Sequence, residues 1–191
     1  MSQPIDFTPG PEDPDRDPTP EECTKVVNVA YELVAYGAVH GVEPADAVGM
    51  PSSYVDALHE LAVRHYQSRQ FDSAAKLYQT LIALKPFQLP FHKGLGACCL
   101  GLERYDAAIK AYNAAVMFGA LDAELHYYLG QAYYFNKEYE PAFDLMRFAR
   151  VLDEQDPNSK GRIAGFATQM LERLKTLVSP EQAALIDLRP S

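Results

Sequence analysis

The sequence has 191 residues, of which 48% are hydrophobic and 23% are charged, and its formal net charge is −9. This composition is typical of a soluble globular protein: no apolar run approaches the roughly 20 residues of a membrane-spanning helix, and no basic face is large enough to neutralise a nucleic-acid backbone. We therefore expect neither membrane insertion nor a nucleic-acid partner. A cytoplasmic location is expected because the N-terminus lacks the pattern of a secretory signal and the three cysteines, two of them adjacent, form no disulfide framework.

Residues 1–19 are predicted to be a disordered, acidic, proline-rich tail. Six of the fourteen prolines fall within the first twenty residues, and seven acidic residues face one arginine in residues 1–22. Such a segment cannot bury enough apolar surface to offset the entropy that it loses on ordering. The tail ends where Thr19, Pro20 and Glu22 form a capping box that starts a helix.

Residues 20–50 are predicted to form a helix and a loop that stand outside the repeats described next. Apolar side chains recur at helical spacing on one face of this helix, namely Val26, Ala30, Leu33 and Val34. This apolar stripe needs a partner surface, which is either the rest of its own chain or the same helix of a second chain. The stripe is therefore a candidate dimerisation surface.

Residues 51–156 carry a repeat of 34 residues, and the segments 55–88, 89–122 and 123–156 align without a gap. Five repeat positions match in all three segments: the seventh (Leu61, Leu95, Leu129), the eighth (Ala62, Gly96, Gly130), the seventeenth (Phe71, Tyr105, Tyr139), the twentieth (Ala74, Ala108, Ala142) and the twenty-fourth (Tyr78, Tyr112, Met146). This period and pattern are typical of tetratricopeptide repeats, each of which is a pair of antiparallel helices.

The matched positions have a physical reason. We expect the small side chains at the eighth and twentieth positions to lie where the two helices approach most closely, and the aromatic side chains to fill the space between successive pairs. No single repeat can bury its apolar face alone, so the repeats must stack. The predicted fold class is all-α: a tetratricopeptide helical solenoid of three helix-pair repeats, with an N-terminal helix and a C-terminal capping helix.

The capping helix is predicted over residues 157–178, beginning at Asp156-Pro157. Its apolar side chains are spaced to cover one face, namely Ile163, Phe166, Met170, Leu174 and Leu177. Residues 179–191 form a C-terminal tail. Within it, Ser179-Pro180-Glu181-Gln182 repeats the capping-box pattern and can start a short last helix.

No catalytic cluster, metal site or cofactor motif is found in the sequence, so an enzyme is not expected. His92 and His126 occupy the same repeat position, but the pair supplies too few ligands for a metal ion. Gly94-Leu95-Gly96 lies in a predicted repeat helix and lacks the third glycine of a phosphate-binding loop. Close helix packing explains these glycines better.

A peptide-binding groove is the remaining candidate site. In a tetratricopeptide stack the first helix of each pair lines the concave side, and its second, fifth, ninth and twelfth positions point inward. The last three of these predict a groove lined by His59, Val63, Tyr66, Lys93, Ala97, Leu100, Tyr127, Gln131 and Tyr134. This mixture suits an extended peptide with apolar anchors. For Val63 and Ala97, packing against a neighbouring helix is an equal alternative, whereas the tyrosines are favoured as contacts.

Several segments of the sequence match a more specific pattern: His65-Tyr66-Gln67-Ser68, Phe71-Asp72-Ser73-Ala74, Phe91 followed by Gly94-Leu95-Gly96-Ala97-Cys98, and Tyr105-Asp106-Ala107-Ala108-Ile109. In these segments the sequence resembles the class II chaperones of bacterial type III secretion systems, which guard hydrophobic translocator proteins before export. The resemblance covers residues 25–156 and is strongest in the first two repeats. The tyrosine-rich residues 125–135 are closer to a generic tetratricopeptide repeat.

The resemblance implies a homodimer formed through the N-terminal helix and a groove that binds an extended segment of a hydrophobic translocator protein in the bacterial cytoplasm. His59, Val63 and Tyr66 match groove positions of that family. The alternative function is an adaptor that bridges soluble partners. An adaptor that clamps a C-terminal carboxylate is disfavoured, because Lys93 alone supplies an inward-pointing cation.

Overall fold

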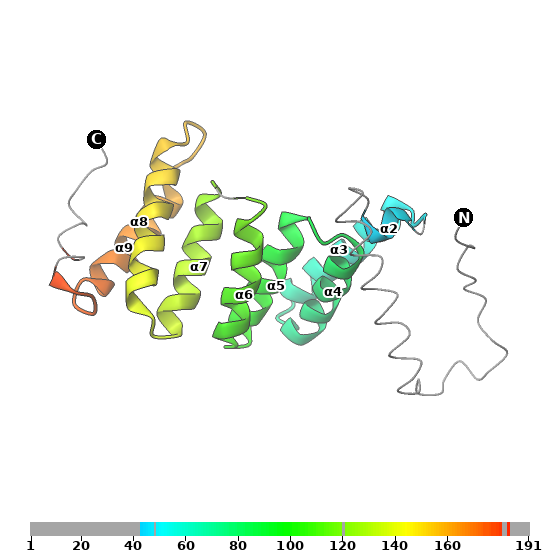
Figure 1. Ribbon diagram of the computed structural model, residues 1–191, viewed down its shortest axis with the longest axis horizontal. Coiled ribbons are helices and arrows are strands. Elements are labelled where there is room, and N and C mark those ends of the chain that lie inside the picture. Colours follow the sequence, from blue (N-terminus) through cyan, green and yellow to red (C-terminus); the bar gives the residue numbers. More distant parts are fainter. Residues whose placement is uncertain (1–42, 48, 120, 181–182, 184–191) are drawn as a thin grey trace, which may run out of the picture.

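The computed structural model describes residues 43–47, 49–119, 121–180 and 183 (Figure 1). The predicted tail over residues 1–19 and the predicted dimerisation stripe of Val26, Ala30, Leu33 and Val34 lie outside the described residues, as does most of residues 179–191. The described part of the chain forms α-helices and no strand.

Six helices form three antiparallel pairs. These are α3 (Ser52–Gln67) with α4 (Phe71–Leu84), α5 (Leu89–Gly101) with α6 (Tyr105–Val116), and α7 (Ala123–Phe135) with α8 (Tyr139–Gln155). Figure 1 shows the pairs side by side in one row, preceded by the short α2 (Pro44–Ala47) and followed by α9 (Arg162–Leu174). The predicted all-α solenoid of three helix-pair repeats is confirmed. None of the helices in the described ranges is both long and apolar enough to cross a membrane.

The small residues lie where the helices of a pair touch, as the repeat predicts. Ala74 is fully buried, and so are the alanines at the same position of the other two repeats. A Cβ atom on Gly96 would lie 2.7 Å from the ring of Tyr112, and one on Gly130 would lie 3.0 Å from the terminal methyl of Met146. Larger side chains at these positions would push the paired helices apart.

The turn inside each pair has the same backbone shape in all three repeats. Arg69, Glu103 and Lys137 lie 34 residues apart and have φ angles of 59°, 58° and 66°. This left-handed conformation closes the end of the first helix, because it turns the backbone N–H groups that follow back toward the last carbonyls of the helix. A left-handed backbone is uncommon for residues other than glycine. Because it recurs at the same position of all three repeats, it is part of the repeat geometry and not a chance feature of one turn.

Two helix boundaries differ from the sequence prediction. Helix α9 begins at Arg162 and not at Pro157. The carboxylate of Asp153 on α8 accepts hydrogen bonds from the hydroxyl of Ser159 and, at 2.8 Å, from the backbone N–H of Ala164, and this holds the intervening chain in a turn. At the other end, the predicted loop from Glu43 to Ser53 contains α2 and the first residues of α3.

Candidate functional site

Three adjoining cavities run along the first helices of the three repeats, and together they are called the groove. The first and second cavities have volumes of about 360 and 390 Å³, and both are bordered by Tyr66, Ala97, Tyr112 and Tyr128. The third, of about 230 Å³, shares Tyr128 and Gln131 with the second and ends against α9. The groove therefore extends from the first repeat to the capping helix.

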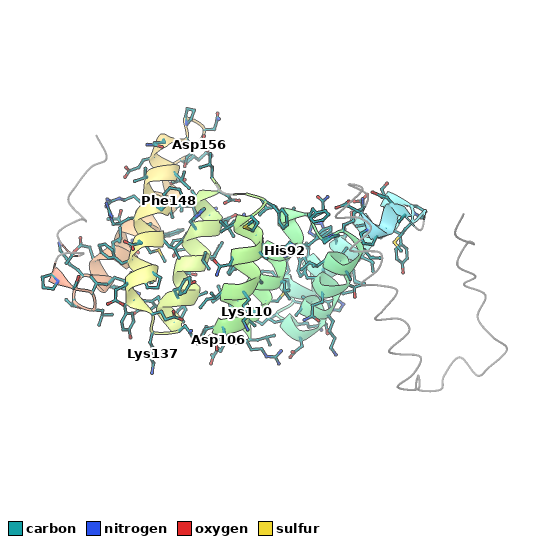
Figure 2. All side chains as sticks on the ribbon, in the orientation of Figure 1. His92, Asp106, Lys110, Lys137, Phe148 and Asp156 are labelled. Carbon is teal, nitrogen blue, oxygen red and sulfur yellow. The ribbon has the colours of Figure 1, made fainter. Side chains whose placement is uncertain are left out.

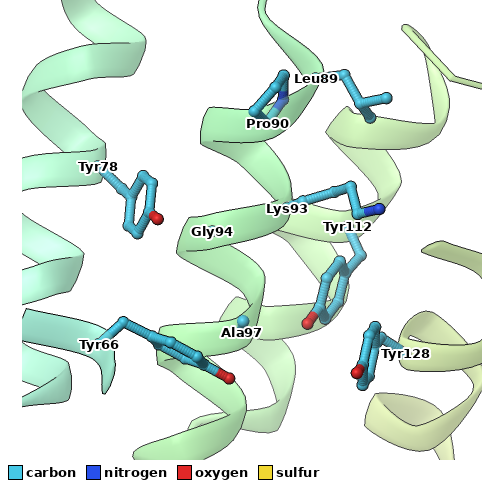
Figure 3. Close-up of a pocket in the computed structure, with 9 residues that line it drawn as sticks. All are labelled: Tyr66, Tyr78, Leu89, Pro90, Lys93, Gly94, Ala97, Tyr112 and Tyr128. Atoms are coloured by element: carbon cyan, nitrogen blue, oxygen red, sulfur yellow. The ribbon is translucent and has the colours of Figure 1, made fainter. Parts of the chain in front are cut away.

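The first cavity lies between two walls of tyrosines. Figure 3 shows Tyr66 and Tyr78 on one side, Tyr112 and Tyr128 on the other, and α5 with Gly94 between them. Leu89, Pro90, Lys93 and Ala97 complete the lining. Each tyrosine ring offers a large apolar surface together with a polar tip, which suits a surface that is wet when empty and dry when a ligand covers it.

Gly94 determines how close the first wall comes to α5. A Cβ atom at Gly94 would lie 2.2 Å from Cζ of Tyr78, which is far inside contact distance. The absence of a side chain therefore allows the Tyr78 ring to lie directly against the helix. Burial of this ring raises the pKa of Tyr78 to about 12, so its hydroxyl is protonated near neutral pH.

The opposite wall consists of the stacked rings of Tyr112 and Tyr128. Their centroids are 6.4 Å apart and their planes differ by 12°. Tyr112 is only 1% exposed, and its hydroxyl has no hydrogen-bond partner among the described residues. An unpaired buried hydroxyl costs about 1–3 kcal/mol, so it is tolerated here at the expense of stability. Burial also raises the pKa of Tyr112.

Lys93 is held by two carboxylates at the start of α7. Its Nζ donates to Oδ2 of Asp122 at 2.8 Å and to Oε2 of Glu124 at 3.0 Å. Burial lowers the pKa of Lys93, but these two hydrogen bonds outweigh it and the net pKa is raised. Asp122 also caps α7 by accepting from the backbone N–H of Leu125 at 2.8 Å. Lys93 is thus a charged bridge between repeats that borders the groove.

Six of the nine predicted groove residues line the cavities: Tyr66, Lys93, Ala97, Leu100, Tyr127 and Gln131. The hydroxyl of Tyr127 accepts a hydrogen bond from Nε2 of Gln131 at 2.8 Å. These two side chains give the third cavity a polar part of its lining.

His59, Val63 and Tyr134 border none of the three cavities. The ring of His59 packs edge-on against Phe91, with centroids 5.2 Å apart, and Tyr134 packs against Tyr139 at 6.0 Å. Val63 is partly buried. Their place in the groove stays a prediction, and for Val63 packing against a neighbouring helix stays the equal alternative.

The sequence rule missed groove residues at other repeat positions. The twenty-fourth position contributes Tyr78 and Tyr112, which were assigned to packing between repeats and which both pack there and line the cavities. The sixth position contributes Gly94 and Tyr128, and the second contributes Pro90. The second position could have been predicted from the sequence, because it is one of the four positions of the first helix that point inward. Nothing in the repeat pattern indicated that the sixth position lines the groove.

The two histidines that share a repeat position, His92 and His126, each form a hydrogen bond with a backbone carbonyl group close to the start of their own helix. A ring nitrogen of His92 lies 2.7 Å from the carbonyl oxygen of Pro86, and one of His126 lies 2.8 Å from that of Asp122. Within the described ranges no group of three or more His, Cys, Asp or Glu side chains is arranged to hold a metal ion.

Comparison with known proteins gives matches in both sequence and structure. The family model described as tetratricopeptide repeat matches residues 59–120. The low calcium response locus protein H of Yersinia pseudotuberculosis is 27% identical over 124 residues, which are 65% of this chain and 73% of that protein.

Two solved structures have the same fold. The Yersinia enterocolitica type III secretion chaperone SycD, in complex with a peptide of the translocator YopD, is 25% identical with a TM-score of 0.62, over 66% of this chain and 95% of that one. PcrH, which is known from Pseudomonas aeruginosa, in complex with the chaperone binding region of PopD, is 23% identical with a TM-score of 0.64, over 67% and 96%. In both sequence and fold, the chain is therefore similar to the tetratricopeptide-repeat chaperones of type III secretion translocators.

Proposed function

We propose that this protein is a type III secretion chaperone that binds hydrophobic translocator proteins in its groove. It holds an extended segment of the translocator and keeps that protein soluble and unassociated in the bacterial cytoplasm before export. The observation that carries this proposal is the row of adjoining cavities with tyrosine walls, which runs along three repeats and in which Ala97 borders both the first and the second cavity. The protein acts by binding and not by catalysis.

The shape and polarity of the groove support an extended ligand with apolar anchors. The first two cavities fall at the lower end of the range of 300–1,000 Å³ that is typical of small-molecule pockets, so each has room for a large apolar side chain. Gln131 and the hydroxyl of Tyr127 supply hydrogen-bonding groups farther along, where the peptide backbone of such a ligand needs partners. A translocator has membrane-seeking segments, and covering part of it limits premature association.

We also propose that the protein forms a homodimer through its predicted N-terminal helix. Two observations support the homodimer: the resemblance to the family, and the apolar stripe of Val26, Ala30, Leu33 and Val34. Size-exclusion chromatography with light scattering on wild type and on Leu33→Asp tests it, with a shift from dimer to monomer as the expected result. An unchanged mass would remove this stripe as the dimerisation surface.

Co-expression tests the chaperone function. The protein is expressed with each hydrophobic protein encoded by a neighbouring open reading frame, and the soluble complex is measured for wild type and for Ala97→Glu, which places a charge between the first two cavities. The matched control is Ala83→Glu, an exposed alanine on α4 that borders none of the three cavities. We expect wild type and the control to keep one such partner soluble, and the Ala97 variant to lose it.

The adaptor function gives a different result in the same experiment. An adaptor would bind a partner without changing the soluble fraction of that partner, and both variants would then behave alike. The carboxylate-clamp form of an adaptor is further disfavoured, because Lys93 is already paired with Asp122 and Glu124.

A further inference from the structure

One edge of the solenoid carries an exposed apolar surface that is separate from the groove. It is formed by the two connections between repeats, and we call it the edge patch: Phe87, Met117, Phe118 and Leu121. Met117 is 80% exposed and Leu121 is 78% exposed. None of the four residues borders any of the three cavities. Contiguous exposed apolar residues of this kind mark interaction surfaces in proteins.

The edge patch is held in place by contacts among its own rings. The rings of Phe87 and Phe118 meet edge to face with centroids 6.0 Å apart, and the ring of Phe118 lies 5.3 Å from that of His92. His92 is in turn fixed by the carbonyl oxygen of Pro86. Figure 2 shows His92 on the side of the row of helices away from Lys137, and the turns on the Lys137 side carry charged residues at their left-handed positions.

The chain enters the described structure beside this patch. The carboxylate of Glu43 accepts hydrogen bonds from Nζ of Lys85 at 2.9 Å and from Nε2 of Gln88 at 3.0 Å, so the residues on both sides of Phe87 hold it. The eight residues before Glu43 read Ala-Tyr-Gly-Ala-Val-His-Gly-Val and include no Asp, Glu, Lys or Arg. An extended segment of this length spans roughly 26 Å, several times the distance between the two phenylalanine rings.

We propose that residues 35–42 of the same chain cover the edge patch. The segment has the apolar character that the patch requires, and its attachment at Glu43 keeps it close at a high effective concentration. The segment links the N-terminal region to the connections between the first, second and third repeats. A second copy of the chain is the competing occupant, and the experiments below distinguish the two.

Disulfide trapping in the full-length chain provides the first test. Val39→Cys is combined with Met117→Cys in a Cys23→Ser background, and the protein is oxidised at low concentration. The buried Cys98 and Cys99 stay in place, because burial raises the pKa of both thiols. We expect a disulfide within one chain, detected by non-reducing electrophoresis and peptide mass mapping. The matched control pairs Val39→Cys with Lys137→Cys on the opposite edge and should cross-link much more slowly.

The outcomes of this test are distinct. A disulfide within one chain that forms at least tenfold faster than in the control supports the proposal. A disulfide between two chains assigns the patch to a second copy and overturns the proposal. Equal rates in both pairs overturn it as well, since the segment would then show no preference for this edge.

Thermal unfolding of full-length variants without new cysteines gives an independent readout. If residues 35–42 cover the patch, Met117→Asp and Val39→Asp each lower the melting temperature, and the double variant lowers it by less than the sum of the two. If the patch is open to solvent, Met117→Asp leaves the melting temperature unchanged, because an exposed side chain loses nothing by becoming polar. Binding in the groove should be the same in all these variants, which separates this proposal from the chaperone function.

Discussion

A groove cavity borders both junctions between repeats, but the junctions differ in the side chain at one repeat position. We call the junction between the first and second repeats open because this position has no side chain there, and the junction between the second and third filled because a ring occupies it. The two differ at the sixth repeat position. At the first junction this position is Gly94, and the Tyr78 ring lies against the bare helix beside a cavity of about 360 Å³. At the second junction it is Tyr128, and its ring stacks on Tyr112.

This difference shows how a repeat protein can build an asymmetric site from near-identical units. At one position the missing side chain lets the Tyr78 ring form one wall of the cavity against α5, and at the equivalent position one repeat later a ring forms part of the opposite wall. The sixth position contacts the preceding repeat in both cases, since Gly94 lies against Tyr78 and Tyr128 stacks on Tyr112. We infer that it sets the depth of the groove at each junction.

The largest effect is expected from emptying the filled junction. Tyr112→Ala removes a ring that is 1% exposed, and large-to-small changes of aromatic core residues cost about 3–5 kcal/mol. Urea unfolding measures the loss. Tyr66→Ala, which removes a ring that is 39% exposed from the wall of the first cavity, serves as the control and should cost clearly less, on the order of 1 kcal/mol. Equal losses at the two positions would contradict the difference between the junctions.

Filling the open junction should have the next largest effect. The new Cβ atom in Gly94→Ala must displace the Tyr78 ring, and overpacking of this kind costs about 1–3 kcal/mol. The gain of about 1 kcal/mol in helix propensity offsets part of this cost. Gly165→Ala on α9 is the control, because nothing lies within 4 Å of its Cβ position, and it should be stabilising. A stabilising Gly94→Ala would show that Tyr78 does not need the bare helix.

Alkaline pH should weaken the open junction. Burial raises the pKa of Tyr78 to about 12, so between pH of about 10 and 12 the folded state keeps a proton that the unfolded state has lost. The corresponding stability is complete below a pH of about 10 and falls as pH rises toward 12, by on the order of 2 kcal/mol. Buried Cys98, whose pKa burial also raises to about 12, adds a loss that starts at lower pH.

The measurement is the free energy of unfolding in urea as a function of pH, for wild type and for Tyr78→Phe. The variant should show a shallower loss of stability above a pH of about 10, since it has no phenol to ionise at this junction. Tyr112 is more completely buried and should ionise after Tyr78 in an ultraviolet titration. Identical pH profiles for variant and wild type would remove Tyr78 as the cause.

The smallest effects are expected from removing single hydroxyl groups. Tyr127→Phe removes the acceptor of the hydrogen bond from Gln131, which should cost about 0.5–1.5 kcal/mol. Tyr112→Phe removes a hydroxyl that has no partner among the described residues, so it should be neutral or stabilising. Chemical denaturation of the two variants in parallel tests the contrast. A loss at Tyr112 as large as at Tyr127 would indicate that its hydroxyl has a partner in solution.

The sequence predicted the helix pairs correctly, because the 34-residue period and the small residues at close contacts are local signals. It did not predict that Tyr78 and Tyr112 border the groove, since that depends on what stands opposite them on another helix. Nor did it place the start of α9: Pro157 is a local signal for a helix start, but the carboxylate of Asp153 on α8 delays the helix through contacts that the linear pattern does not contain.

The three left-handed turns allow the cooperativity of unfolding to be mapped. Arg69, Glu103 and Lys137 adopt the same uncommon conformation, one in each repeat. Glycine adopts it without steric cost, so a single glycine substitution applies the same small perturbation to each repeat in turn. Solenoids need not unfold in one step, because each repeat contacts only its neighbours. Equal shifts in all three variants would mean that the array melts as one unit, and unequal shifts would rank the repeats by the order in which they open.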